Sequence, residues 1–211
     1  MQNDDKKQPF SLRHNGRWTV AGLVVIGVAF GIVFSTGFSN AMHWAGSTAF
    51  CGEFCHSMDV TYAAYKKGLH YKTASGVSAG CSDCHLLNES NGHNNPVQYA
   101  ALLADKIVSA SHSGIGEVLG HLDTPEKQIE KRPEMAGNVL ALMRERAFSS
   151  CLGCHDLSKM ENETKPVIAR MHRKMADATN PADCLACHPT AGHDYEKARE
   201  DIEKIVADAA K

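Results

Sequence analysis

The sequence predicts a mostly α-helical protein with long irregular loops, preceded by one transmembrane helix. Three observations lead to this fold class. Residues 18–38 are apolar and uncharged, short paired-cysteine motifs recur through the rest of the chain, and strand-like alternation is scarce there. Because the region after the apolar segment has little continuous apolar pattern, we expect bound cofactors to form much of its core.

All eight cysteines lie in four short motifs, each followed directly by a histidine. Three motifs read C-x-x-C-H, and the first has one extra residue between its cysteines. The residues are Cys51, Cys55 and His56; Cys81, Cys84 and His85; Cys151, Cys154 and His155; and Cys184, Cys187 and His188. C-x-x-C-H is the c-type haem attachment site. The motifs therefore predict four covalently bound haem c groups and a role in electron transfer.

Other uses of paired cysteines explain the pattern less well. A zinc site needs two such cysteine pairs around each ion. This interpretation does not explain why a histidine follows every second cysteine. A thioredoxin-like pair belongs in a βαβ unit, which the sequence lacks, and a disulfide framework also ignores the histidines. At the first motif, the extra residue leaves open whether both cysteines are attached.

The apolar segment reaches roughly 30 Å as a helix, enough to cross a membrane. Basic residues precede it, at Lys6, Lys7, Arg13 and Arg17, so the positive-inside rule holds the N-terminus in the cytoplasm. The alternative is a cleaved signal peptide ending near Ala41, but the run exceeds the usual length of a signal core. We expect a cytoplasmic tail over residues 1–17, an anchor over 18–40 and a periplasmic haem domain over 41–211, in the cytoplasmic (inner) membrane.

Within residues 41–211, two motifs precede the predicted central helices and two follow them, which suggests haem pairs at about residues 51–96 and 149–193. Residues 86–96 are rich in turn-forming residues and read as a loop. We predict helices over 97–113, ended by Gly114 and Gly116; over 125–148, broken near Pro133; and over 166–178. An amphipathic C-terminal helix is predicted over 194–210.

Four irons offer eight axial positions, so distal ligands are needed besides the histidines of the motifs. The distal candidates His70, His172 and His193 lie in polar stretches near attachment motifs. Met58 follows the first motif and either ligates the iron, which raises the potential of a haem, or packs against the porphyrin. His14 is on the cytoplasmic side in this topology, and His43, His93 and His121 are secondary candidates or surface residues.

These motifs together resemble the NapC/NirT (NrfH/CymA-like) family of membrane-anchored tetrahaem cytochromes. The resemblance lies in the C-H-x-M end of the first motif at 55–58, the segment 69–85, the segment 165–172 and the pair at 192–193, and it spans about residues 18–195. It implies a quinol dehydrogenase: quinol is oxidised beside haem 1 at the membrane face, and electrons pass to a soluble or peripheral periplasmic redox protein or a partner subunit. No nucleic-acid partner is expected.

The resemblance also implies a lysine near haem 1 with an aspartate six or seven residues later. Lys106 keeps the lysine, but His112 stands where the aspartate is expected. Three roles stay open for His112: an axial ligand of haem 1, the proton acceptor for quinol, or a surface residue. Because the first motif also departs from the usual spacing, both differences fall at the same haem.

Three other functions remain open from the sequence. The protein can run in the opposite direction as a quinone reductase, since direction depends on potentials. It can be a tethered electron carrier without quinone chemistry, or a terminal reductase if one iron has an open coordination position.

Overall fold

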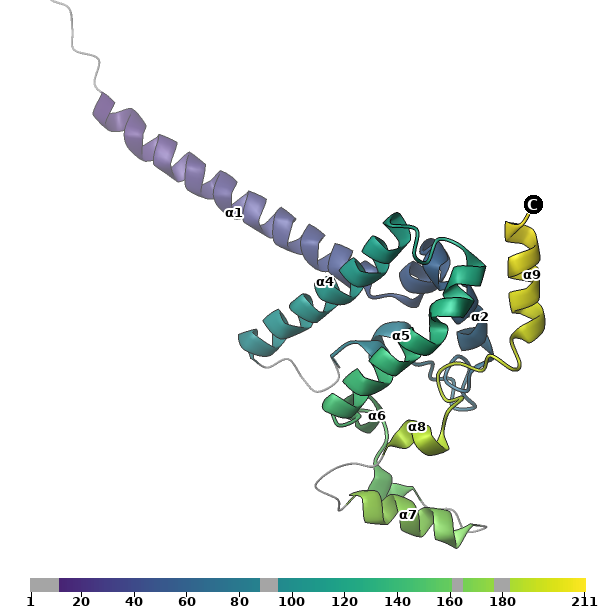
Figure 1. The fold of residues 1–211 in the computed structure, drawn as a ribbon. Helices are drawn as coiled ribbons and strands as arrows, with labels where there is room; N and C mark the ends of the chain where they lie inside the picture. The colour runs from purple at the N-terminus through teal and green to yellow at the C-terminus, as the bar shows by residue number, and fades with distance from the viewer. Residues whose placement is uncertain (1–11, 88–94, 161–164, 177–182) are drawn as a thin grey trace, which may run out of the picture. The chain divides into compact units, whose positions relative to one another are not determined.

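The computed structural model describes residues 12–87, 95–160, 165–176 and 183–211, and the regular elements in these ranges are all helical, without a strand. The chain divides into two compact units, residues 1–43 and 44–211. The mostly α-helical prediction is therefore confirmed for the described residues (Figure 1). Three predicted segments lie wholly or partly outside the described residues: most of the predicted tail, part of the predicted loop at 86–96 with His93, and the last two residues of the helix predicted over 166–178.

The first unit contains helix α1, Leu12–Ala45. Its segment Trp18–Ala45 is the only helix of the described residues that is long and apolar enough to cross a membrane, and the side chains of its most apolar window are all exposed. The helix is longer at both ends than the anchor predicted over 18–40. No acidic residue lies in its first turn, and nothing in the sequence breaks the helix before Ala45, because Gly37 and Ser39 are tolerated inside apolar helices.

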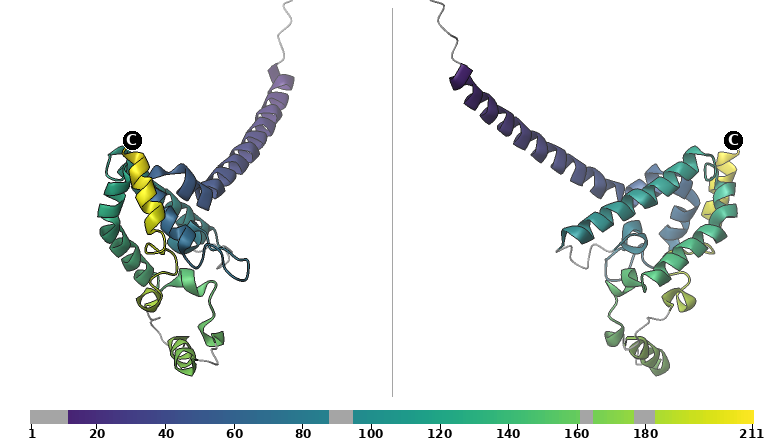
Figure 2. Two further views of the ribbon diagram at one scale, coloured as in Figure 1. Left: turned by 90° about the vertical axis from the view of Figure 1, so that its right-hand side faces the viewer. Right: turned by 60° about the vertical axis from the view of Figure 1, so that its left-hand side comes forward.

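The second unit is an assembly of short and medium helices joined by irregular segments (Figures 1 and 2). Its elements are the π-helical turn η1 (Phe50–Phe54), the 3₁₀ turns η2 (His56–Met58) and η4 (Leu157–Lys159), and the helices α2 (Asp59–Lys67), α3 (Cys81–His85), α4 (Pro96–Val118), α5 (Pro125–Glu145), α6 (Ser149–Leu152), α7 (Pro166–Ala176), α8 (Cys184–Cys187) and α9 (Arg199–Ala209).

Helix α2 is the centre of the packed core. Val60, Ala63, Ala64 and Tyr65 are buried on it, and α5 and α9 both pack against it. The described residues hold few other buried apolar side chains: Leu102, Phe148, Ala169 and Ala198. Such a small side-chain core agrees with the expectation that other groups fill the interior of this unit.

Helix α4 continues past the glycines that were expected to end it. It runs to Val118 because the stop lies at Gly120, whose φ of +71° suits glycine. The amide of Gly120 donates to the carbonyl of Glu117 (2.9 Å), and that of His121 donates to Gly116 (2.8 Å). This pair of bonds is the Schellman motif, so the prediction of an end near residue 113 was wrong.

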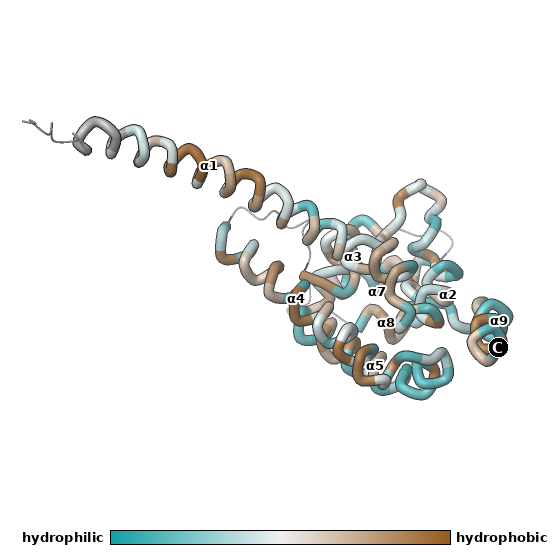
Figure 3. Tube along the Cα trace, turned by 90° about the horizontal axis from the view of Figure 1, so that it is seen from above, coloured by the Kyte–Doolittle hydropathy of each residue, from teal (hydrophilic) through white to brown (hydrophobic). Residues whose placement is uncertain are grey.

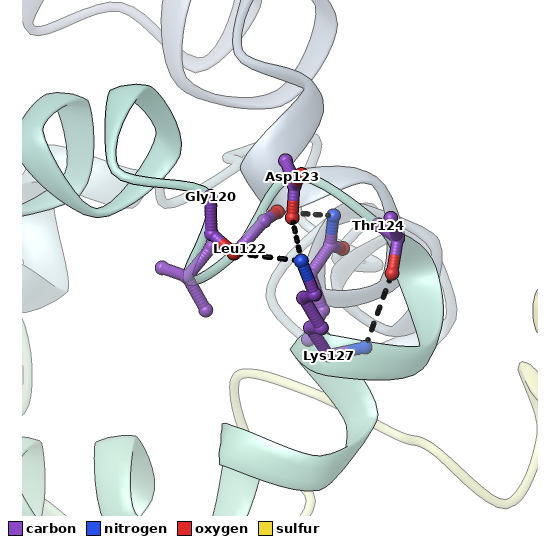
Figure 4. Close-up of polar contacts among 6 residues, drawn as sticks. Gly120, Leu122, Asp123, Thr124 and Lys127 are labelled. Atoms are coloured by element: carbon purple, nitrogen blue, oxygen red, sulfur yellow. Dashed lines mark hydrogen bonds and ion pairs between the residues drawn. The ribbon is translucent and has the colours of Figure 1, made fainter.

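Helix α5 is continuous through Pro133, which corrects the predicted break. Pro133 is exposed, so water can bond to the carbonyl that proline leaves without a donor. The helix begins at Pro125, after the N-cap Thr124, whose hydroxyl accepts a bond from the amide of Lys127 (3.5 Å). The ammonium of Lys127 in turn donates to Asp123 (2.7 Å) and to the carbonyl of Gly120 (2.8 Å), as Figure 4 shows.

The C-terminal helix begins at Arg199, five residues later than predicted. The residues before it form a turn in which the carboxylate of Asp194 accepts a bond from the amide of Lys197 (3.0 Å). Asp194 competes for backbone donors as a capping residue does, and this delays the helix. Helix α9 is tied to α2 by the ion pair between Lys67 and Asp201 (3.0 Å).

Candidate haem-binding site

The four cysteine motifs adopt two backbone forms. The second, third and fourth motifs lie on the short α-helical turns α3, α6 and α8, or directly after them. The first begins on the π-helical turn η1, which holds Cys51, and Cys55 is the C-cap residue of this turn, in extended backbone. A π-helix has more residues per turn than an α-helix, so the wider turn takes up the extra residue between the two cysteines of the first motif.

The motifs lie next to one another in their order along the chain. The thiols of Cys51 and Cys81 lie close enough that each shifts the pKa of the other, which places the first motif next to the second. Helices α3 and α6 are in contact, which joins the second to the third. A hydrogen bond between the Cys151 and Cys184 side chains joins the third to the fourth.

Three pairs of histidines face each other at similar distances. The ring centres are 6.0 Å apart for His85 and His193, 5.9 Å for His70 and His155, and 6.3 Å for His172 and His188. Each pair joins one motif histidine to one distal candidate. The sequence singled out all six residues, but not which histidine faces which.

This spacing fits one iron between each pair. A metal-bound imidazole nitrogen lies about 2 Å from the metal. The ring centre lies roughly 1 Å further out, so two imidazoles on opposite sides of one iron have centres about 6 Å apart. The paired residues therefore fit bis-histidine haem c, with the two cysteines of a motif close in sequence to each motif histidine.

The backbone holds the distal imidazoles in one orientation. Nδ1 of His70 lies 2.8 Å from the carbonyl oxygen of Ala191, and Nδ1 of His193 lies 3.2 Å from that of Thr61. A carbonyl only accepts, so each Nδ1 carries the proton and donates, and each Nε2 is left with its lone pair. This is the tautomer that an iron ligand needs.

Burial keeps the imidazoles of His85 and His193 neutral. Burial, and to a lesser extent the neighbouring His193, lowers the pKa of His85 to about 4. Burial also lowers the pKa of His193, although its hydrogen bond to the Thr61 carbonyl acts in the opposite sense. At neutral pH both rings are therefore uncharged, which is the form that binds a metal.

A close backbone approach brings the distal histidines together. Gly68 ends α2, and a Cβ built there would lie 2.3 Å from the carbonyl oxygen of Gly192. The amide of Asp194 also donates to the carbonyl of Ala64 (3.0 Å). The segment that carries His193 is thus laid directly on the end of α2. The role of Gly68 was not found from the sequence, because one glycine gives no signal of a partner more than a hundred residues away.

The first motif differs from the others in its histidine. The side chain of His56 is 79% exposed, and its Nδ1 lies 3.5 Å from the carboxylate of Asp59. Met58 is half-buried two residues later. The hydroxyl of Ser57, between them, is buried and has no hydrogen-bond partner among the described residues. Among the residues that the structure describes, the first motif therefore has no histidine pair like those of the other three.

A buried glutamine on α5 holds the backbone after the first motif. The Gln128 side chain is 3% exposed; its amide nitrogen donates to the carbonyls of His56 (2.8 Å) and Leu122 (3.2 Å), and its oxygen accepts from the amide of Val60 (3.2 Å). The contact to Leu122 lies beside the Lys127 network in Figure 4. This role of Gln128 was not predicted from the sequence, since a lone glutamine in a charged helix gives no sign of burial.

The two residues expected at the quinol site lie on different sides of α4. Lys106 is half-buried and His112 is exposed, about 120° apart at 100° per residue. Glu117 lies eleven residues after Lys106 and so shares its face. Burial and the charge of Glu117 raise the pKa of the Cys55 thiol, which puts this carboxylate near the first motif. Glu117 was also missed from the sequence, although its spacing from Lys106 is three helical turns.

Two ion pairs fix the segments around the second, third and fourth motifs. The Arg146 guanidinium lies 2.7 Å from the Asp105 carboxylate, which also accepts from the amide of Leu87 (2.8 Å). Arg144 pairs with Asp183 (2.5 Å), and Asp183 caps α8 by accepting from the amides of its first turn. Both arginines come from the C-terminal end of α5, so this helix end organises the later motifs.

The helical fold, the motifs and the histidine pairs define the chain as a c-type cytochrome, an electron-transfer protein, with one helix able to span a membrane. Residues 13–198 match the NapC/NirT cytochrome c family, N-terminal region. The chain belongs to this family, and covalently bound haem c is what the family implies.

Named relatives cover most of the chain. It is 34% identical over 182 residues to the denitrification system component NirT of Stutzerimonas stutzeri, which covers 86% of this chain and 85% of the relative. It is 31% identical over 209 residues to the cytochrome c-type protein NapC of Escherichia coli K12, covering 95% and 98%. The cytochrome c-type protein TorC of the same strain is 32% identical, with 44% of its length covered. No solved structure matches the chain.

Proposed function

We propose that this chain is a membrane-anchored tetrahaem cytochrome c that oxidises quinol at the outer face of the inner membrane and passes electrons to a periplasmic redox protein. The observation that carries the proposal is the set of three histidine pairs spaced for iron, each at an attachment motif, in a chain with one membrane helix. The basic residues before that helix support a cytoplasmic N-terminus.

The proposed cofactors are four haems attached at the four cysteine pairs. The contacts support His85 with His193, His155 with His70, and His188 with His172 as axial pairs. For haem 1 we propose Met58 or His56 as the protein ligand. Haem supplies the one-electron chemistry, while the protein sets ligands, spacing and exposure. The sequential contacts of the motifs support one electron path from the first to the fourth.

Quinol oxidation also releases two protons, so the site needs groups that accept them. The sequence offers Lys106 and His112, and the geometry adds Glu117, which shares the face of Lys106 and lies near Cys55. Cys51 follows the last residue of α1 by only six positions, a link of roughly 20 Å at full extension. That short link supports a position of the first motif near the membrane face.

The test is haem reduction by a water-soluble menaquinol analogue in the purified full-length holoprotein. We expect rapid reduction in the parent protein, a large loss in Glu117→Gln, and no loss in Glu130→Gln, an exposed carboxylate on α5. The variant His112→Gln separates the two roles of that residue: an altered haem spectrum marks a ligand, and slower reduction with an unchanged spectrum marks a proton acceptor. Absence of reduction in the parent protein would exclude the quinol dehydrogenase and favour the tethered carrier or the reverse reaction.

The reverse reaction uses the same residues and is tested in the same preparation. Pre-reduced protein is mixed with the quinone analogue, and the rate of haem oxidation is compared with the rate of reduction by quinol. The direction of electron flow is set by the difference in potential between the haems and the quinone pool. If the quinone oxidises the haems faster than quinol reduces them at the potentials of that pool, the protein is a quinone reductase.

A further inference from the structure

Helix α4 presents an exposed apolar face that nothing in the described residues covers. Its most exposed apolar side chains, together with that of the C-cap residue, are between 53% and 87% exposed: Val97, Ile107, Val108, Ile115, Val118 and the C-cap Leu119. Hydrophobic residues recur along the whole helix (Figure 3). Single exposed apolar residues are ordinary, but a continuous face of three turns or more marks an interaction surface.

The exposed arc is wide and carries no charge. At 100° per residue, the exposed positions of α4 after its first turn cover about 200° of the circumference. The charged residues of the helix, Asp105, Lys106 and Glu117, are all half-buried on the opposite side. The helix therefore has its polar face turned to the protein and its uncharged face turned outward, the reverse of an ordinary surface helix.

The exposed face of α4 could bind a lipid surface or a second copy of the chain, and the width of the uncharged arc distinguishes between these two partners. A helix that pairs with another helix in water buries a narrow seam and keeps charged residues on both flanks. Here the uncharged exposed arc is far wider than any seam, and the charged residues Asp105 and Glu117 lie just beyond its two edges, half-buried against the protein. A helix lying in the membrane interface, by contrast, can bury a broad uncharged arc in the headgroup and acyl boundary.

The position of α4 in the chain favours the same occupant. Its C-terminal end carries Glu117, whose charge acts on Cys55, and the first motif begins six residues after the membrane helix. The C-terminal end of α4 is thus near the first motif, and a short piece of chain connects that motif to the membrane helix. We propose that α4 lies on the membrane surface with its exposed face in the lipid, as a second membrane contact besides α1. The proposal depends on the membrane anchor and not on quinol oxidation.

The test uses the full-length holoprotein in nanodiscs of phosphatidylethanolamine and phosphatidylglycerol that contain a phospholipid with a photoactivatable group high on its acyl chain. After illumination, labelled peptides are quantified by mass spectrometry. Peptides of α1 give the positive reference, and peptides of the charged helix α9 give the negative one. We expect α4 peptides to be labelled several-fold above those of α9.

A double variant, Val108→Glu with Ile115→Glu, is expected to lower the labelling of α4 several-fold while that of α1 stays constant. Ile129→Glu on α5, another exposed apolar position, is the matched control and should leave α4 labelling unchanged. Haem content and spectrum confirm that each variant is folded, and the parent measurement needs no variant. Labelling of α4 at the level of α9, or cross-links between α4 of two chains, would overturn the proposal. Neither readout involves quinol, so loss of quinol activity alone leaves it standing.

Discussion

Replacing Gln128 with leucine should destabilise the protein and disturb the first motif in particular. The glutamine and leucine side chains are similar in size, so the change removes hydrogen bonds without opening a large cavity. Three bonds are lost, to the backbone of His56, Val60 and Leu122. The variant therefore measures what these bonds contribute where the first motif meets α2 and α5.

The magnitude follows from the burial of the partners. Val60 is 2% exposed, so its amide loses its acceptor in a place that water reaches poorly. A buried group left without a partner costs about 1–3 kcal/mol. With the amide of Val60 and the carbonyl of His56 both affected, we expect a loss of about 3 kcal/mol. For a unit of this size that corresponds to a fall in Tm of roughly 6–12 °C.

The assay is thermal unfolding of the holoprotein in detergent, followed by circular dichroism, with a redox titration of the haems at ambient temperature. Gln128→Glu keeps the acceptor for Val60 but loses the donor to His56, so it should fall between the leucine variant and the parent. Glu130→Ala, exposed on the same helix, should change Tm little. A leucine variant as stable as the parent, with all haem potentials unchanged, would refute this assignment of Gln128.

Three further substitutions test other contacts. Gly68→Ala places a methyl group against the carbonyl of Gly192 and should shift one haem away from its low-spin spectrum; an unchanged spectrum contradicts the packing. Ala147→Gly relieves a φ of 51°, which costs a residue with a Cβ about 1–2 kcal/mol, and it loses about 0.4–1 kcal/mol through the larger entropy of the unfolded chain. Stability in chemical denaturation should therefore rise by about 1 kcal/mol or less, whereas a loss argues against that backbone conformation. Asp105→Asn weakens a mostly buried ion pair with Arg146 and should cost about 1–3 kcal/mol; a neutral result would show that water already screens the pair.

The sequence predicted the parts of the fold that depend on local pattern. The uncharged segment indicated α1, Pro125 and Pro166 are each the first residue of a helix expected there, and the helix expected from Val97 begins one residue earlier, at Pro96. Helix ends were predicted less well. Gly114 and Gly116 looked like stop signals, but the stop at Gly120 depends on two hydrogen bonds that only the three-dimensional turn reveals.

The sequence predicted which histidines belong to the candidate site, but not which histidine pairs with which. The distal histidines were identified by their proximity to the motifs, yet His193 faces His85, and His70 faces His155. These partners are separated by most of the second unit, and no local rule relates them. Gln128 and Glu117 were missed for the same reason, since each acts through a contact with the first motif that comes from a distant helix.

The small side-chain core leads to a last prediction about folding. The core of the described part of the second unit holds eight buried apolar residues, and four of them are alanine. Burial of about 25 cal/mol per Å² over so few side chains cannot offset the entropy of ordering a chain of this length. We therefore expect chain made without haem attachment to lack a cooperative unfolding transition while α1 stays helical in detergent. Circular dichroism with limited proteolysis measures this, and a protease-resistant second unit in such a preparation would contradict it.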